Sequence, residues 1–351
     1  MTLTKNMTKG ENAMHDFFRK EEEWFTFYDG EGKKIDRKTE IRYDPLTGES
    51  SRLVFDPGMD LTPPDYTEAA AQTEGKNCPF CPENVHKMTP VFPEEIAAEG
   101  RISHGQAIVF PNLFPYSKHN GVVVFSGDHY VRLADFTVPM IKDAFMAAQI
   151  YIQNVMAVEN KPLHISINWN YLPYSGGSIL HPHLHVVISE SATNYQTLMN
   201  QKSKAFKATH NKEYFDHLYA AEKETGARWI GERGNVAWMH AYAPKAHNDF
   251  LTVFAGKNSI QDINEQDWEH FAEGLQAIFS TLTEQGLASF NMVLHFSNEG
   301  APIHARLVPR LTLGGLDTSD INFFQMLHEE PLTYKIPEDV AQKARVHFSN
   351  I

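Results

Sequence analysis

An internal repeat is the feature of this 351-residue chain that most restricts its fold. The stretch NLFPYSKHNGVVVFSG spans residues 112–127, and AYAPKAHNDFLTVFAG spans residues 241–256. Each combines a proline-containing segment, a His-Asn pair and a β-rich run that ends in glycine. Proline and glycine mark turns, and runs of β-branched and aromatic residues between them favour strands. The repeat therefore predicts two similar units in one chain.

An amphipathic helix is predicted after each copy of the repeat. In the first unit, Thr137 can cap the helix, and Pro139 lies in the first turn, where its missing N–H is harmless. In the second unit, Asn264 is the cap and Gly286 marks the end. One apolar stripe per helix follows the 3.6-residue period: Ile141, Phe145, Ala148, Ile152 and Val155 in the first, and Trp268, Phe271, Leu275, Ile278 and Leu282 in the second.

A strand is predicted after each helix, at residues 163–170 and 290–297, and a loop then leads to the last strand of each unit. Aligning the two last strands gives three pairs: His304 with His181, Arg306 with His183, and Val308 with His185. By this alignment the second unit lacks the middle and last histidines. We therefore expect the second unit to be a degenerate copy that completes the architecture.

The predicted fold class is α+β, with two fused units that each pack a helix on an antiparallel sheet. The proposed parts are an N-terminal extension with the cysteine pair (1–104), a first, catalytic unit (105–190), a helical connection (191–230), a second unit (231–312) and a C-terminal tail (313–351). In the connection, Tyr214, Phe215, Leu218 and Tyr219 form a partial apolar face.

Three histidines alternate in the last strand of the first unit, SGGSILHPHLHVVIS (175–189). Successive side chains of a strand point to opposite faces, so His181, His183 and His185 would share one face. The Ser-Gly-Gly-Ser turn before them allows a ligand close to the backbone, because glycine has no Cβ. A metal, a nucleophile and a phosphate are the candidates. Clustered titratable groups beside such a turn favour chemistry over chance, although the chain has 18 histidines.

Both cysteines of the chain, Cys78 and Cys81, lie in the segment NCPFCPEN. Their spacing fits three interpretations: a redox pair, two buried thiols, or half of a metal site. A thioredoxin-like site requires a preceding strand and a following helix that the surrounding pattern does not supply. We therefore favour zinc, with histidines as the remaining ligands.

Composition restricts the partners. The net charge of −13 argues against a nucleic-acid binder that works through a broad basic surface, yet it leaves room for a small phosphorylated substrate. The N-terminus lacks the apolar core of a signal peptide, and no apolar run approaches the roughly 18 residues that span a bilayer. We expect a cytoplasmic protein that binds neither nucleic acid nor membrane.

Taken together, these motifs resemble the galactose-1-phosphate uridylyltransferase branch of the histidine-triad superfamily, over roughly residues 40–312. HPHLHVV matches the triad pattern, and RYDPLTGE (42–49) is similar to the family's N-terminal RYNPLTG segment. CPFC resembles its metal-binding cysteine pair and FSGDH its third-ligand segment. NWNYLPYSGGSILHPHLH resembles its active-site segment. The resemblance implies two fused histidine-triad-like units, a homodimer, and turns in the N-terminal extension that contact the nucleotide.

The same resemblance assigns roles by position. Cys78, Cys81, His129 and His181 would hold one structural Zn²⁺. His183 would be the nucleophile, with His185 and Ser178 as further catalytic residues. The substrate-binding set would be Asn112, Asn170, Gly176, Gly177, Ser178 and His185.

The chain departs from the family pattern in three places. His185 stands where the uridylyltransferases have glutamine. A third histidine at this position is typical of other nucleotide-transferring and nucleotide-hydrolysing triad proteins. SSRLVFDPG replaces the Arg-bearing segment after NPLTG, which weakens the case for uridine diphosphate sugars. A second metal site would need two histidines near the end of the second unit. His304 supplies one and His295 is a further candidate, but Arg306 stands in place of the other.

The resemblance implies nucleotidyl transfer between a nucleotide sugar and a sugar 1-phosphate or phosphate, through a covalent nucleotidyl-histidine, with galactose or other carbohydrate metabolism as its setting. One alternative is a phosphorylase or hydrolase of nucleotide sugars or dinucleoside polyphosphates. Another is a zinc-containing nucleotide-binding protein without turnover.

Overall fold

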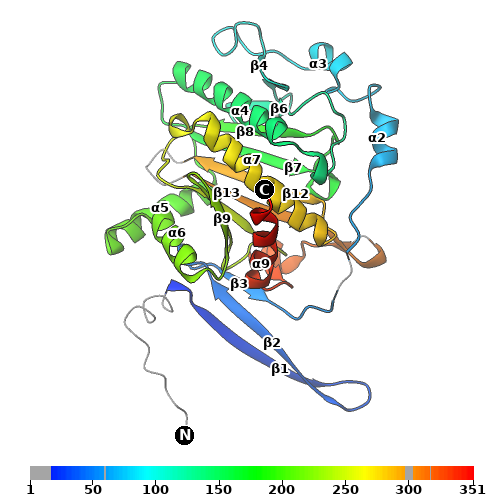
Figure 1. Ribbon diagram of the computed structural model, residues 1–351, viewed down its shortest axis with the longest axis vertical. Helices are drawn as coiled ribbons and strands as arrows, with labels where there is room; N and C mark the ends of the chain where they lie inside the picture. Colours follow the sequence, from blue (N-terminus) through cyan, green and yellow to red (C-terminus); the bar gives the residue numbers. More distant parts are fainter. Residues whose placement is uncertain (1–16, 59–60, 297–302, 317) are drawn as a thin grey trace.

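The computed structural model describes residues 17–58, 61–296, 303–316 and 318–351. Its centre is an antiparallel ten-stranded sheet (Figure 1). In spatial order the strands are β4 (Ile102–His104), β5 (Ala107–Pro111), β6 (His119–Val124), β8 (His183–Ser189), β7 (His164–Tyr171), β12 (Ser289–Phe296), β13 (His304–Arg310), β11 (Phe250–Phe254), β10 (Val236–His240) and β9 (Trp229–Arg233). From one edge inward the strands follow the order β4, β5, β6, β8, β7, and from the other edge the order is β9, β10, β11, β13, β12. The two halves therefore have the same arrangement, and β7 pairs with β12 where they meet.

Two long helices lie side by side across one face of this sheet (Figure 1). They are α4 (Val138–Val158) and α7 (Glu265–Glu284), and both predicted stripes are buried. The Thr137 side chain accepts a hydrogen bond from the backbone N–H of Met140, and the Asn264 side chain accepts one from Asp267. These contacts satisfy N–H groups that a helix start leaves without partners, so the predicted caps are confirmed.

Strand alternation divides the side chains of the central strands between the two faces. Ile167 and Trp169 of β7 and Leu184 and Val186 of β8 belong to the core cluster that contains the helix stripes. The intervening residues, which include the histidines of β8, therefore face the other side of the sheet.

The second half of that other face is covered by two further helices, α5 (Asn194–His210) and α6 (Tyr214–Thr225). Tyr214, Phe215 and Leu218 pack against the second half of the sheet in a separate core cluster. The first half of this face carries a smaller core cluster of Val85, Phe110, Val122 and Val124. His183 and His185, the histidine pair of β8, lie on the same face.

The chain ends complete the molecule. A long hairpin projects from the body and forms a four-stranded sheet with two short strands (Figure 1): β1 (Lys20–Tyr28), β2 (Lys34–Tyr43), β3 (Ser50–Leu53) and β16 (Leu332–Thr333).

The remaining elements are α2 (Thr67–Thr73), α3 (Pro82–Met88), η1 (Leu133–Asp135), η2 (Pro173–Ser175), η3 (Ile260–Asp262), β14 (Thr312–Leu313), η4 (Gly314–Leu316), β15 (Thr318–Ser319), α8 (Phe323–Leu327) and α9 (Pro337–Ser349). Helix α9 packs on α7 and adds Val340, Ala341, Ala344 and Phe348 to the main core. Within the described residues, no helix is both long and apolar enough to cross a membrane.

Candidate functional site

Four side chains from three segments meet at one point. Cys78, Cys81, His129 and His181 are all buried, and their potential ligand atoms lie within 4.8 Å of one another. Cys81 Sγ lies 3.3 Å from Nδ1 of His129 and 3.8 Å from Nδ1 of His181. Two thiols and two imidazoles are a donor set typical of structural zinc sites. The structure thus brings together the whole predicted ligand set, and these residues fit the metal.

The two histidines of this cluster are oriented through their other ring nitrogens. Nε2 of His181 donates to the carbonyl oxygen of Ser126 at 2.8 Å, and Nε2 of His129 lies 2.9 Å from the hydroxyl of Thr73. Such partners fix the rings of metal-binding histidines, here with Nδ1 toward the cysteines. Burial raises the pKa of Cys78 to about 11, and a bound divalent cation would favour the thiolate instead.

His183 begins β8, two residues after the cluster. Its Nδ1 lies 2.8 Å from the carbonyl oxygen of His181, an acceptor that assigns the ring proton to Nδ1 and the lone pair to Nε2. Burial lowers the pKa of His183, against the opposing effect of this hydrogen bond. Phe80, from the cysteine loop, packs edge-on against the ring, with 5.1 Å between centroids. The imidazole is therefore neutral at neutral pH and fixed in orientation.

His185 lies next to His183 on the same face of the sheet. Its ring centroid is 5.1 Å from that of His183 and 6.0 Å from that of Tyr116. Burial, with a smaller effect of His183, lowers the pKa of His185 to about 4. Its Nδ1 is buried and has no hydrogen-bond partner among the described residues. A buried polar atom without a partner is costly, so this nitrogen suits contact with a substrate.

The Ser-Gly-Gly-Ser turn lies between β7 and β8 and has an unusual backbone. Leu172, just before it, has φ +68°, a strained value for leucine. Gly176 has φ +85°, and a Cβ on Gly177 would lie 3.0 Å from the carbonyl oxygens of Asn170 and Leu172. Glycine is needed at both positions. Ser178 ends the turn and is exposed, so its hydroxyl can be approached from solvent.

A hydrogen-bond chain from the second half of the sheet holds this turn. Asn291 of β12 donates from Nδ2 to Oδ1 of Asn170 at 2.7 Å and to the carbonyl oxygen of Ser175 at 2.9 Å. Arg310 donates to Oδ1 of Asn291 at 3.2 Å and is itself paired with Asp320 at 2.8 Å. The predicted substrate-binding Asn170 is therefore supported by two residues, Asn291 and Arg310, that no sequence motif indicates.

Asn112 follows β5 and shapes the turn that leads to β6. Its Nδ2 donates to Oδ1 of Asn120 and its Oδ1 accepts from the backbone N–H of Phe114, both at 3.0 Å. The turn exposes Leu113, Phe114 and Tyr116, and the ring centroid of Tyr116 lies 6.0 Å from that of His185. An aromatic side chain of this turn therefore lies beside His185, and the hydrogen bonds of Asn112 stabilise the turn itself.

The register of the sheet corrects the expected alignment of the two units. His183 pairs with Val124, and His304 pairs with Val253. Each valine lies directly before the Phe-x-Gly end of its repeat. His304 therefore occupies the place of His183, and its expected alignment with His181 is wrong by two residues. The repeats alone could not show this, because the loops that lead to the last strands are unrelated.

The second unit fills the corresponding place with a buried ion pair. Arg306 occupies the position that His185 has in the first unit, and its Nε lies 2.9 Å from Oδ1 of Asp249. Tyr195 of α5 stacks on His295 at 4.6 Å, and the His295 ring lies 5.2 Å from that of His304. In the part of the chain that the structure describes, the four-residue cluster is the one group of three or more potential metal ligands, so a second metal site finds no support there.

Several contacts at the site had little sequence signal. Phe80 lies between the two cysteines, and that position alone could have suggested that its ring packs near His181 and His183. Thr73 and Ser126 belong to no pattern. Asn291 stands on an outward-facing position of β12, a signal that becomes useful only when β7 is known to be its neighbour.

Comparison with other sequences finds one relative of high coverage. An uncharacterized protein of Archaeoglobus fulgidus is 33% identical over 339 residues, which is 95% of this chain and 99% of that protein. No family model matches this chain.

Solved structures with the same arrangement are more distant in sequence. A GalT-like protein and an ADP-glucose phosphorylase with bound ADP-glucose, both from Arabidopsis thaliana, each have a TM-score of 0.67, at 17% and 16% identity. A uridylyltransferase has a TM-score of 0.64 at 18% identity. Each comparison covers 88% of this chain and 98% of the other. The expected fold, with two fused histidine-triad-like units, is confirmed.

Proposed function

Because the chain belongs to the same family as the Archaeoglobus fulgidus protein and has the galactose-1-phosphate uridylyltransferase-like fold of the histidine-triad superfamily, we propose that it is a nucleotidyltransferase. Its donor would be a nucleotide sugar, and its acceptor a sugar 1-phosphate or inorganic phosphate. The ADP-glucose bound by the Arabidopsis phosphorylase supports this substrate class. The nucleotidyl group would pass through a covalent intermediate on His183.

The observation that carries this proposal is the state of the His183 ring. Its Nδ1 is tied to a backbone carbonyl at 2.8 Å, and burial keeps the ring neutral, so Nε2 has a fixed lone pair. Nε2 attacks the α-phosphorus of the donor, the bond from that phosphorus to the bridging oxygen breaks, and sugar 1-phosphate leaves. An acceptor phosphate oxygen then attacks the same phosphorus and releases His183. Two displacements replace one difficult step.

The neighbouring groups would stabilise the charge that develops on the phosphoryl oxygens. In the turn before the strand, the N–H groups of Gly176 and Gly177 donate to the carbonyl oxygens of Pro173 and Leu172. The exposed hydroxyl of Ser178 is therefore the donor that the turn offers, and His185 offers a ring N–H from the same face. Asn170 is held in place by Asn291 at 2.7 Å. Preorganised donors of this kind typically contribute about 10²–10³ in rate each.

The metal in this proposal is one zinc ion held by Cys78, Cys81, His129 and His181. With four protein ligands it would be structural and would not contact substrate. It would tie the cysteine loop, which carries Phe80, to the segment that leads into β8. A cytoplasmic homodimer in carbohydrate metabolism is the setting we propose, from the resemblance in the sequence.

A matched pair of variants tests the proposal. Purified protein is assayed with UDP-, ADP- and GDP-sugars, each with inorganic phosphate, a sugar 1-phosphate or water as acceptor. His183→Gly should abolish turnover with the preferred pair. His304→Gly changes the equivalent position of the second unit and should retain turnover, provided that its melting temperature shows a folded protein.

The acceptor that supports turnover separates transferase, phosphorylase and hydrolase. If the protein turned over a dinucleoside polyphosphate but no nucleotide sugar, dinucleoside polyphosphates would be its substrate class. Tight nucleotide binding without any product would show a binding protein and contradict the proposal.

A further inference from the structure

A cavity of about 700 Å³ lies at the end of the second unit, between the C-terminal end of α7 and the first turns of α9. The segment after β3 and the segment before β11 complete its walls. This volume falls within the range of small-molecule sites, about 300–1,000 Å³. None of the proposed metal ligands or catalytic residues lines it. It is therefore a different place from the site described above.

His247 is the most unusual residue of the cavity wall. It is 5% exposed, and neither of its ring nitrogens has a hydrogen-bond partner among the described residues. Burial lowers the pKa of His247 to about 4, so at neutral pH the ring offers one donor and one acceptor. Buried polar groups that stay unpaired destabilise the folded protein. A ligand that both donates and accepts would remove this cost.

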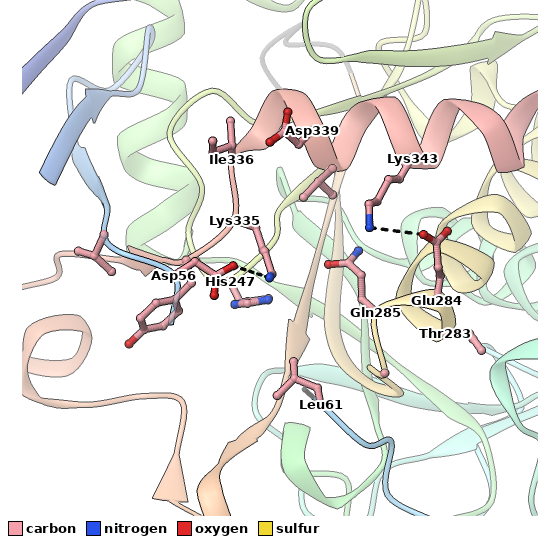
Figure 2. A pocket seen from close by; sticks show the side chains of 14 residues that line it. Asp56, Leu61, His247, Thr283, Glu284, Gln285, Lys335, Ile336, Asp339 and Lys343 are labelled. Carbon is pink, nitrogen blue, oxygen red and sulfur yellow. Dashed lines mark hydrogen bonds and ion pairs between the residues drawn. The ribbon is translucent and has the colours of Figure 1, made fainter. Parts of the chain in front are cut away.

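The charged groups around the cavity are balanced. Lys335 lies 2.6 Å from Asp56, and Lys343 lies 3.4 Å from Glu284. Figure 2 shows the first pair beside the imidazole and the second across the cavity, with Asp339 on the helix above. Two lysines face three carboxylates, so the wall has no excess of positive charge. Phosphates and nucleotides, which need such an excess, are poorly matched.

We propose that this cavity binds a neutral saccharide of one or two hexose units. Sugar hydroxyls both donate and accept, which suits a wall of ammonium, carboxylate and neutral imidazole groups. Tyr334, whose ring centroid lies 6.1 Å from that of His247, provides an apolar surface for the C–H face of a sugar ring. Leu61 and Val340 add further apolar wall. This inference does not depend on the proposed nucleotidyl transfer.

The test is a titration of the full-length protein with D-glucose, D-galactose and maltose, followed by NMR. The Cε1–H resonance of His247 is identified by its absence from His247→Phe. At least one sugar should shift this resonance in a saturable way, whereas inorganic phosphate should not. A saturable shift with phosphate, or none with any of these sugars, would overturn the proposal.

Three variants show whether the imidazole makes the contact. His247→Phe should weaken binding at least tenfold and leave the melting temperature equal or higher, because no unpaired polar group remains. His247→Gln keeps a donor and an acceptor and should bind within a few-fold of the wild type. His210→Phe, at an exposed histidine of α5, should bind unchanged.

Equal affinity in His247→Phe would contradict the assignment, as would a large loss of melting temperature in both His247 variants. Adduct formation at His183 should be unaffected in every one of these variants. Failure of the saccharide site is therefore distinguishable from failure of the proposed transfer.

Discussion

At the scale of single residues, the two histidines of β8 differ in what holds them. His183 is fixed by the backbone carbonyl of His181 and by Phe80, so its orientation is set before any substrate arrives. His185 has a buried nitrogen that the described protein leaves without a partner. We therefore propose that His183 attacks phosphorus and that His185 donates to a phosphoryl oxygen.

Substitution of His185 tests this division of roles. Glutamine also presents an N–H donor, so His185→Gln should retain much of the transfer activity, while His185→Ala should lose about 10²–10³ in kcat. Steady-state kinetics over a range of pH measures both. If His185→Gln has no turnover, or if its pH dependence changes, the residue acts as a proton donor to the leaving group.

At the scale of elements, the site depends on strands from both units. β12 presents Asn291 to the end of β7 and to the turn that precedes β8, and Arg310 of β13 holds Asn291. In the second unit Arg306, paired with Asp249, takes the place of His185, but the strands of this unit hold the turn that precedes the histidines of the first.

Asn291→Leu should therefore reduce kcat/KM about tenfold, because lost hydrogen bonds worth about 1.4 kcal/mol in the transition state correspond to that factor. Metal content should stay unchanged. Val293→Ala, two residues along the same face of β12, is the matched control and should remain near wild type. Equal losses in the two variants would mean that β12 has only a packing role.

The Cys78, Cys81, His129 and His181 cluster joins the cysteine loop to the segment before β8, so loss of a metal held there should affect the fold as well as the site. Cys78→Ser should lower both metal content and melting temperature, since structural zinc contributes roughly 10–16 kcal/mol in zinc-finger peptides at neutral pH. Elemental analysis should find one zinc per chain in the wild type. A folded, active protein that contains no metal would disprove this assignment.

At the scale of the whole molecule, a buried ionic network joins the chain ends. Arg42 of β2 makes two hydrogen bonds of 2.9 Å to Glu338 of α9, and Arg228 donates to the same carboxylate at 2.8 Å. Arg228 also contacts Glu222 at the end of α6, at 2.8 Å. Removing one member of such a network leaves buried charges unpaired, which is strongly destabilising.

This network predicts a pH-dependent part of stability. Burial alone would raise the pKa of Glu338, but the hydrogen bonds and charges of Arg42 and Arg228 lower it from 4.5 to about 2. A lowered folded-state pKa stabilises the protein above pH 4.5, and this contribution is lost as the pH falls toward 2. The melting temperature of Glu338→Gln should therefore lie below that of the wild type at pH 7, and this gap should close between about pH 5 and 2. Glu68→Gln, at an exposed position, should show no gap; a gap for Glu338→Gln that does not change with pH would contradict the account.

The fold was largely predictable from the sequence, because helix caps, apolar stripes and the repeat are local patterns. The cluster of Cys78, Cys81, His129 and His181 was predictable for a similar reason, since these residues lie in recognisable sequence segments. The register of the second unit was not, because nothing local relates His304 to Val253. The support of Asn170 by Asn291 was also hidden, since it depends on two strands that are far apart in the sequence and adjacent only in the sheet.

The role of His183 is tested by the mass of the intact protein after rapid mixing with a nucleotide sugar and no acceptor. We predict the addition of one nucleoside monophosphate to His183, which should be stable in base and labile in acid, as a phosphorus–nitrogen bond requires. His183→Gly should form no adduct while retaining its metal. Turnover without any adduct, even at the shortest quench times, would show direct displacement and contradict the role of His183 as the nucleophile.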